Sequence, residues 1–194
     1  MKFFSGPGCR SLILVIALAL CTTVAATDKD AAVARLQGGD VLLLRHAIAP
    51  GFGDPEGFRV DDCSTQRNLS EAGRRQASAI GAWLRARGIN GARVYSSQWC
   101  RCLETAELLD LGEVSPLPAL NSFYERPADR ETNLRALRAF LASYTPRSQP
   151  LVLVTHQVTV TALTGIFPGS GEGVVATLAG NGELSDFARL GFDQ

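Results

Sequence analysis

Two short aliphatic runs, each separated by a single residue from one of the two histidines of the chain, constrain the fold most. Residues 41–44 and 151–154 contain only valine and leucine. Continuous apolar runs of this length are typical of strands that are buried on both faces of a parallel sheet. In open α/β sheets, ligands bind beyond the carboxyl ends of the strands. We therefore expect His46 and His156, which follow these runs, to lie at the ligand-binding edge of the sheet.

The remaining sequence alternates between strand and helix patterns. We expect strands at residues 93–96 and 114–120, the second at an edge because it holds two prolines. We expect helices at residues 33–36, 71–87 (capped by Ser70), 100–109, 131–144 and from 159 onward. Residues 173–179 and 184–192 flank Gly-Asn-Gly, which indicates a hairpin. This order predicts a three-layer α/β/α sandwich, with a mainly parallel sheet and an antiparallel C-terminal hairpin.

The first 26 residues have the composition of a secretory signal peptide. Lys2 and Arg10 supply positive charge, residues 12–20 are continuously apolar, and small residues lead up to Ala26. The apolar stretch is too short to span a bilayer comfortably. We expect cleavage near Ala26, one domain over residues 27–194, a periplasmic or secreted location, and no stable membrane span after processing. Lipoprotein processing at Cys21 and a retained anchor are the alternatives.

Charge and cysteine content exclude several classes of protein. The leader holds two of the 19 basic residues and none of the 19 acidic ones, so residues 27–194 carry a formal charge of −2. Nucleic-acid-binding domains are strongly basic, so we expect no nucleic-acid partner. Cys63, Cys100 and Cys102 remain after processing, and an exported protein can hold one disulfide and one free thiol. Their spacing does not fit a zinc site, and we expect no metal and no cofactor.

Arginines and histidines near the expected strand ends favour phosphate chemistry. A neutral imidazole is a nucleophile that can form a covalent phosphoryl intermediate. Phosphoryl transfer mainly requires positioning and charge stabilisation, which the planar guanidinium groups of Arg45 and Arg101 can supply. Taken singly, either arginine fits an ordinary solvated position at least as well. Placement of His46, Arg101 and His156 at strand ends or a helix N-terminus favours a shared anion site.

Four segments resemble, in order, the signature of the histidine phosphatase superfamily, which includes phosphoglycerate mutases and acid phosphatases. Residues 44–47 read L-R-H-A, like the R-H-[GA] of that family. Residues 69–77 (L-S-E-A-G-R-R-Q-A) resemble its L-[ST]-x-x-G-x-x-Q-A helix. Residues 95–106 (Y-S-S-Q-W-C-R-C-L-E-T-A) resemble its S-S-x-x-x-R-x-x-x-T-A segment, and His156 stands at its second histidine. The resemblance covers nearly all of residues 40–165.

This resemblance implies a phosphatase that hydrolyses a small-molecule phosphate ester through phosphohistidine. His46 would be the phosphorylated nucleophile, and Arg45, Arg101 and His156 would complete the phosphate pocket. The oligomeric state does not follow from the sequence.

The general acid is assigned from a weaker part of the same resemblance. Many relatives carry a glutamate between the second arginine and the second histidine, and Glu125 is the acid in that position. A salt bridge from Glu125 to Arg126 or Arg130 is the alternative. The acid phosphatase branch has His-Asp at the second histidine, whereas glutamine follows His156 here. This departure argues against a phytase-like branch.

Residues 47–68 form a long turn-rich loop, which we expect to cover the pocket. We expect Gln66, Arg67 and Asn68 to contact the substrate, with an anion contact from Arg67; loop capping by Arg67 is the alternative. Residues 61–68 and 99–102 resemble a small exported bacterial subgroup that includes proteins likened to lipopolysaccharide core heptose-phosphate phosphatases. Pairing of Cys63 with Cys100 or Cys102 would pin this loop over the pocket.

Other functions are compatible with the same residues. One is a catalytically idle domain that binds phosphate or a phosphosugar, although binding alone needs no nucleophile. Another is a phosphomutase, which would release little free phosphate. A phosphorylated protein is a further possible substrate.

Overall fold

The computed structural model describes residues 1–2, 28–145 and 149–192. The expected signal peptide lies almost entirely outside these residues. Within them, six strands form one sheet in the order β3-β2-β4-β1-β5-β6. The strands are β1 (Val41–Arg45), β2 (Arg93–Ser96), β3 (Val114–Pro116), β4 (Leu151–Thr155), β5 (Gly173–Leu178) and β6 (Leu184–Leu190). The first four pair in parallel, whereas β5 is antiparallel to both β1 and β6.

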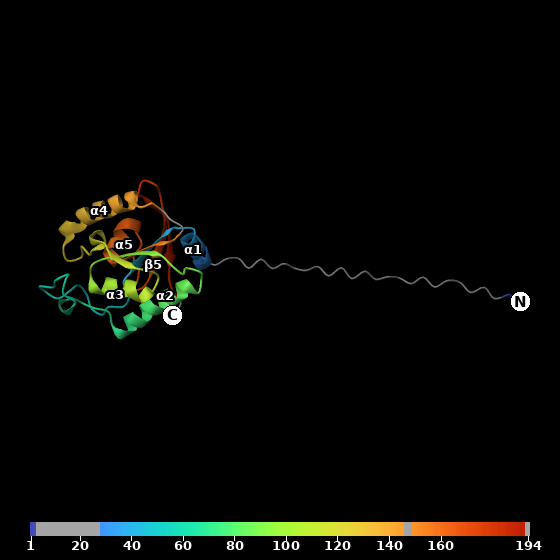
Figure 1. The fold of residues 1–194 in the computed structure, drawn as a ribbon, viewed down its shortest axis with the longest axis horizontal. Coiled ribbons are helices and arrows are strands. Elements are labelled where there is room, and N and C mark those ends of the chain that lie inside the picture. The colour runs from blue at the N-terminus through green and yellow to red at the C-terminus, as the bar shows by residue number, and fades with distance from the viewer. Residues whose placement is uncertain (3–27, 146–148, 193–194) are drawn as a thin grey trace.

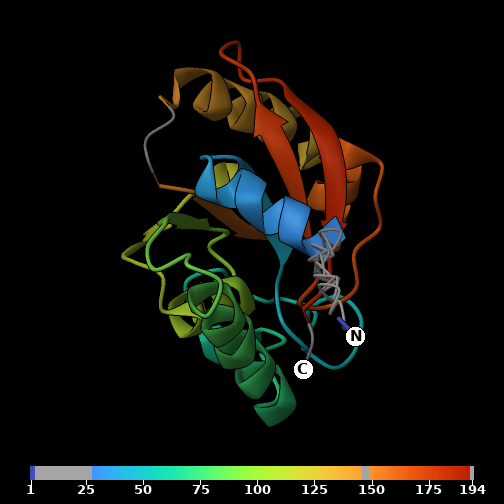
Figure 2. The same ribbon diagram turned by 90° about the vertical axis from the view of Figure 1, so that its right-hand side faces the viewer.

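Helices cover both faces of the sheet. The described helices are α1 (Asp28–Gln37), α2 (Glu71–Arg85), α3 (Cys100–Leu109), α4 (Arg130–Ser143) and α5 (Gln157–Thr164), with short 3₁₀ turns η1 (Cys63–Thr65), η2 (Pro118–Leu120) and η3 (Pro127–Asp129). Helices α4 and α5 lie on the side of the sheet opposite to α2 and α3 (Figure 1). Figure 2 shows α1, in blue, against the red strands β5 and β6. The predicted three-layer α/β/α sandwich is confirmed.

Alternation along the central strands produces two cores. Leu42 and Leu44 of β1 pack with α1, α2 and α3, whereas Val41 and Leu43 pack with η2, α4 and α5. All four side chains are fully buried. Because both faces of β1 and β4 are covered, their sequences are continuously apolar rather than alternating.

Several element boundaries differ from the predictions by one residue or more. Helix α1 begins at Asp28 rather than at residue 33, and α5 begins at Gln157 rather than at 159. The expected strand at 114–120 ends at Pro116, because Pro118 begins a 3₁₀ turn instead. Among the described residues, no helix has the length and apolar character needed to cross a membrane.

Candidate active site

The strand order brings the two histidines together. Strands β1 and β4 are parallel neighbours in which Arg45 is opposite Thr155, so the residues that follow them leave the sheet side by side. The backbone amide of His46 donates to the carbonyl of Thr155 at 2.9 Å. The ring centroids of His46 and His156 are 5.6 Å apart. Both imidazoles therefore lie at the carboxyl edge of the parallel strands, as the sequence predicted.

A cavity of about 320 Å³ opens at this edge. Six residues singled out in the sequence line it: Arg45, His46, Arg67, Arg101, Glu125 and His156. They come from the ends of β1 and β4, the first turn of α3 and two loops. The fold thus brings together residues that are far apart in the sequence, and Arg45 and His156 are separated by 111 positions.

His46 is held as a neutral imidazole with one free nitrogen. Its ring is 2% exposed, and its Nδ1 lies 2.8 Å from the carbonyl oxygen of Ala47. A carbonyl only accepts hydrogen bonds, so Nδ1 carries the proton and Nε2 keeps its lone pair. Burial, followed by the positive charge of Arg101, lowers the pKa of His46 to about 3. At neutral pH this imidazole has the electronic state of a nucleophile.

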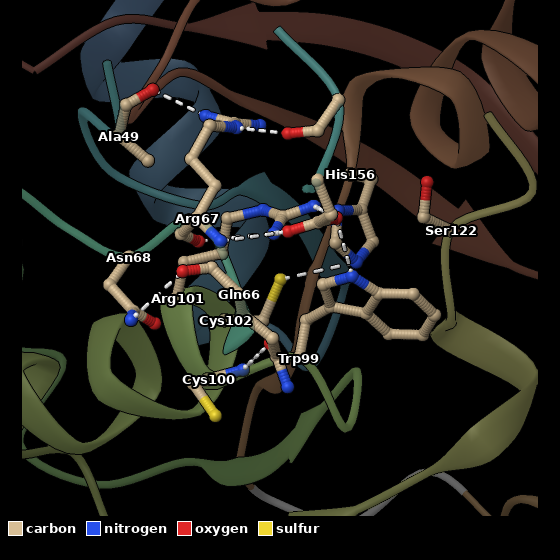
Figure 3. A network of polar contacts seen from close by, with 12 residues as sticks. Ala49, Gln66, Arg67, Asn68, Trp99, Cys100, Arg101, Cys102, Ser122 and His156 are labelled. Carbon is tan, nitrogen blue, oxygen red and sulfur yellow. Dashed lines mark hydrogen bonds and ion pairs between the residues drawn. The ribbon is translucent and has the colours of Figure 1, made fainter. Parts of the chain in front are cut away.

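The ring of His156 is held by polar contacts to two buried side chains. Its Nε2 lies 2.9 Å from the hydroxyl of Ser97. The thiol of Cys102 lies 3.5 Å from the same nitrogen (Figure 3). Burial, followed by the charge of Arg101 and then the electrostatic interaction with His46, lowers the pKa of His156 well below its usual value. Burial also raises the pKa of the Cys102 thiol to about 12, so this sulfur is uncharged. These contacts fix the ring at the cavity wall.

Arg101 forms a buried ion pair that sequence reasoning missed. Its two terminal nitrogens donate to Asp54, at 2.7 Å to Oδ1 and 3.0 Å to Oδ2. The same carboxylate accepts from the indole of Trp99 at 2.9 Å and from the amide of Arg67 at 3.0 Å. Although burial opposes it, the bonds and charge of Arg101 lower the pKa of the Asp54 carboxyl. Asp54 therefore stays ionised and fixes the plane of the guanidinium.

Two arginines in the cavity wall retain unused donors. Arg45 donates from Nη1 to the carbonyl of Pro168 at 3.0 Å. The Nε atoms of Arg45 and Arg101 are buried and have no hydrogen-bond partner among the described residues. A buried donor without an acceptor is costly, so these two groups are suited to an oxyanion that would supply one.

Arg67 reaches the cavity from the long loop. Its Nε donates to the carbonyl of Gly53 at 2.7 Å, and its Nη1 donates to the carbonyl of Ala49 (Figure 3). Burial, followed by the charge of Arg101, lowers the pKa of Arg67. Arg67 thus performs the loop capping considered as its alternative role, and it also lines the cavity.

Gln66 and Asn68 are not among the residues that line the cavity, and their contact with the substrate stays a prediction. The amide nitrogen of Gln66 donates to the carbonyls of Arg59 and Val60, and its oxygen accepts from the backbone of Cys100. Asn68 donates to the carbonyls of Cys63 and Gln66. Their polar groups are used to satisfy the loop backbone, because a loop without regular structure has no ladder to do so.

A disulfide joins Cys63 to Cys100 and leaves Cys102 as a free, buried thiol. The bond attaches the loop to the first residue of α3, immediately before Arg101. Of the two pairings that the sequence left open, the structure contains the first. The loop that supplies Asp54 and Arg67 is therefore covalently fixed to the helix that supplies Arg101.

Glu125 also reaches the cavity. Its carboxylate accepts a hydrogen bond from the backbone amide of Asp54. Among the described residues, Arg130 pairs with Glu131 rather than with Glu125. No group of His, Cys, Asp or Glu side chains in the described ranges is arranged to hold a metal ion.

Comparisons with known proteins agree with this geometry. Residues 41–132 match the model of the histidine phosphatase superfamily, branch 1. No protein of curated function matches the sequence significantly.

Among solved structures, the tungstate complex of the protein histidine phosphatase SixA is similar at 19% identity, with 78% of this chain and 96% of that chain covered and a TM-score of 0.55. A putative phosphohistidine phosphatase SixA from Agrobacterium tumefaciens is similar at 24% identity, with 79% and 99% covered and a TM-score of 0.52. A mycobacterial glucosyl-3-phosphoglycerate phosphatase is similar at 19% identity, with 71% and 92% covered and a TM-score of 0.51. At such identities the likeness establishes the fold.

Proposed function

We propose that the chain is a histidine phosphatase, a metal-independent phosphomonoesterase that works through phosphohistidine, and the match of residues 41–132 to the superfamily model supports this. The observation that carries the proposal is the state of His46. Its imidazole is buried and neutral, its Nδ1 is bonded to a carbonyl, and its cavity is shared with Arg45, Arg67 and Arg101. A binding domain would need the arginines but not the free lone pair of Nε2.

In the first step, Nε2 of His46 attacks phosphorus and the ester P–O bond breaks. The leaving oxygen takes a proton from the carboxylic acid of Glu125, which lines the same cavity. The phosphoryl oxygens accept hydrogen bonds from the arginines, including the unpartnered Nε groups of Arg45 and Arg101. His156 lies beside the same oxygens and adds a further polar contact.

In the second step, water attacks phosphorus and the P–N bond breaks. The carboxylate of Glu125 takes the proton of the water, and His46 regains its lone pair. Inorganic phosphate is then released. A phosphomutase would instead return the phosphoryl group to the bound alcohol, so release of phosphate separates the two reactions.

The proposed substrate is a small phosphate ester, with phosphosugars as the first candidates. The support is the sequence resemblance of residues 61–68 and 99–102 to the heptose-phosphate phosphatase subgroup. We further propose that residues 1–26 are a signal peptide and that residues 27–194 act in the periplasm or outside the cell. The Cys63–Cys100 disulfide supports this location, because stable disulfides form in oxidising compartments.

The test compares the native protein with His46→Gln and His156→Gln in excess EDTA, on 4-nitrophenyl phosphate. The native protein should release phosphate and form an acid-labile ³²P adduct when quenched during turnover. His46→Gln should lose both signals by at least about 10³-fold, since no nucleophile remains. His156→Gln should keep a detectable adduct at lower turnover, because its phosphate contact is lost but the nucleophile is intact.

Two results would contradict the proposal. Turnover by His46→Gln would exclude a phosphohistidine at this position. Loss of activity in EDTA that added divalent metal restores would place a metal in the reaction.

A further inference from the structure

The mouth of the cavity is formed by three exposed aromatic side chains. Phe52 is 97% exposed, Phe167 63% and Tyr124 60%, and all three line the cavity. They come from three segments that are far apart in the sequence. Six large hydrophobic side chains are exposed among the described residues, and half of them surround this one opening. Soluble proteins rarely gather exposed apolar groups in this way unless the groups bind something.

The backbone presents Phe52 outward. Gly51 and Gly53 on either side have φ values of +96° and +62°, which side chains with a Cβ adopt reluctantly. The chain therefore turns sharply both before and after Phe52. The Phe52 ring is therefore exposed and lines the cavity together with the arginines, rather than packing in the core.

Charge is distributed unevenly between the floor and the mouth. The cations Arg45, Arg67 and Arg101 are buried or half-buried, where they can bind the phosphoryl group. Among the exposed residues that line the cavity, the charged one is Glu125, an acid. A second anionic group on the substrate would meet no lining cation at the mouth, whether Glu125 is ionised or carries the proton that it donates. The mouth thus favours a leaving group without charge.

We propose that Phe52, Tyr124 and Phe167 form an aromatic collar that selects phosphate esters of uncharged alcohols with an apolar ring face. This rests on the proposed phosphatase function and adds its leaving-group specificity. Sugar rings and aryl rings share the required chemistry, because each offers a flat face of carbon and hydrogen. The side chains Ser122 and Gln157, which also line the cavity, can bond the hydroxyls of a sugar.

The collar contacts a part of the substrate that does not react. Its contribution is therefore equal in the ground state and the transition state, and its loss raises KM without lowering kcat. One aromatic contact changes affinity by about three- to tenfold. A disturbance of the fold would instead lower kcat for every ester.

The experiment uses four esters of primary alcohols, so that the reacting bond is the same. Benzyl phosphate and glucose 6-phosphate carry rings, ethyl phosphate has none, and phosphoglycolate has a carboxylate. Phosphate release is measured for the native protein, Phe52→Ala and Phe167→Ala. Phe187→Ala is the matched control, because Phe187 is exposed on β6 and does not line the cavity.

The two ring esters should have the higher kcat/KM, and phosphoglycolate the lowest. Each collar variant should raise KM for a ring ester about three- to tenfold and leave ethyl phosphate unchanged. If only one ring ester is preferred, the result supports the collar and identifies whether the natural leaving group is an aryl alcohol or a sugar.

Phosphoglycolate as the best ester, or ring esters unaffected by both collar variants, would overturn the inference while leaving the phosphatase function intact. An equal effect of Phe187→Ala would also overturn it. Absence of phosphate release from all four esters and from 4-nitrophenyl phosphate would overturn the proposed function and the inference together.

Discussion

A histidine that remains neutral in the folded protein makes that protein less stable in acid, and His46 has this property. Its pKa is about 3 when folded, whereas an unfolded histidine titrates near 6.5. Between these values the unfolded chain binds a proton that the folded chain does not, so stability falls as the pH falls. At pH 5 the difference is about 2 kcal/mol for this residue.

We therefore expect His46→Gln to reduce the pH dependence of stability. Urea unfolding at pH 8 and pH 5 should show that the native protein loses about 2 kcal/mol more than the variant over this interval. The part of the His156 contribution that comes from burial and from Arg101 is present in both proteins and cancels. Equal losses in the two proteins would mean that His46 is protonated in the folded state at pH 5.

Individual site residues were predictable to different degrees. His46 and His156 could be placed because each follows a strand, and strand ends converge at one edge. The role of Asp54 could not be predicted, because an acid in a loop belongs to no periodic pattern and its partner Arg101 is 47 positions away. Whether Gln66 contacts the substrate or the loop backbone could not be decided from the sequence for a related reason. A polar loop residue has the same sequence signature whether it binds substrate or its own backbone.

Helix α2 approaches two other segments so closely that only glycine fits at the contacts. A Cβ at Gly73 would lie 2.0 Å from the carbonyl oxygen of Ile48, and one at Gly81 would lie 2.0 Å from that of Leu109. Both neighbours are backbone atoms, which cannot rotate away. Gly73 therefore controls the distance between α2 and the segment that follows His46, whereas Gly81 controls the distance to the end of α3.

We expect Gly73→Ala and Gly81→Ala each to lower the free energy of unfolding by about 1–3 kcal/mol, even though alanine favours the helix. Only Gly73→Ala should also lower kcat, because Ile48 is two residues from His46. Gly81→Ala is the matched control for the effect of destabilisation alone. Urea unfolding and phosphate release under folding conditions measure the two effects. A similar fall in kcat for both variants would contradict a local role for Gly73.

The bounds of helices and strands could be predicted where the sequence pattern was strong and were missed where it was weak. The bounds of β2 and α3 agree with the sequence prediction, because turn residues and apolar spacing limit them. The first turn of α1 was missed since residues 28–31 read D-K-D-A and have no apolar stripe. The start of α5 was missed because His156, at its N-cap position, makes no side-chain capping bond.

Across the whole molecule, the sheet order decides which residues meet. Strand β4 comes from the C-terminal half of the chain but lies between β1 and β2 from the N-terminal half. The superfamily match ends at residue 132, yet His156 and Phe167 from beyond it complete the cavity. The order of motifs along the sequence indicated which residues take part. Their arrangement around one opening follows from the insertion of β4.

The disulfide between Cys63 and Cys100 and the apolar leader together predict where the chain is located. Thiols usually stay reduced in the cytoplasm, so the Cys63–Cys100 bond supports the proposed export. In a Gram-negative host the protein should be recovered from the periplasm, with its N-terminus at Thr27 and one free thiol after denaturation. N-terminal sequencing and thiol titration check both points.

Matched leader variants separate the possible routes. Leu14→Arg with Leu18→Arg interrupts the apolar stretch and should leave a full-length protein in the cytoplasm, with all five cysteines reduced. Cys21→Ser should be exported and cut like the native chain, because cleavage after Ala26 does not use this cysteine. Lipid attachment that disappears in Cys21→Ser would indicate lipoprotein processing instead. Native protein that retains Met1 in the cytoplasm would rule out export, and the disulfide would then need another oxidant.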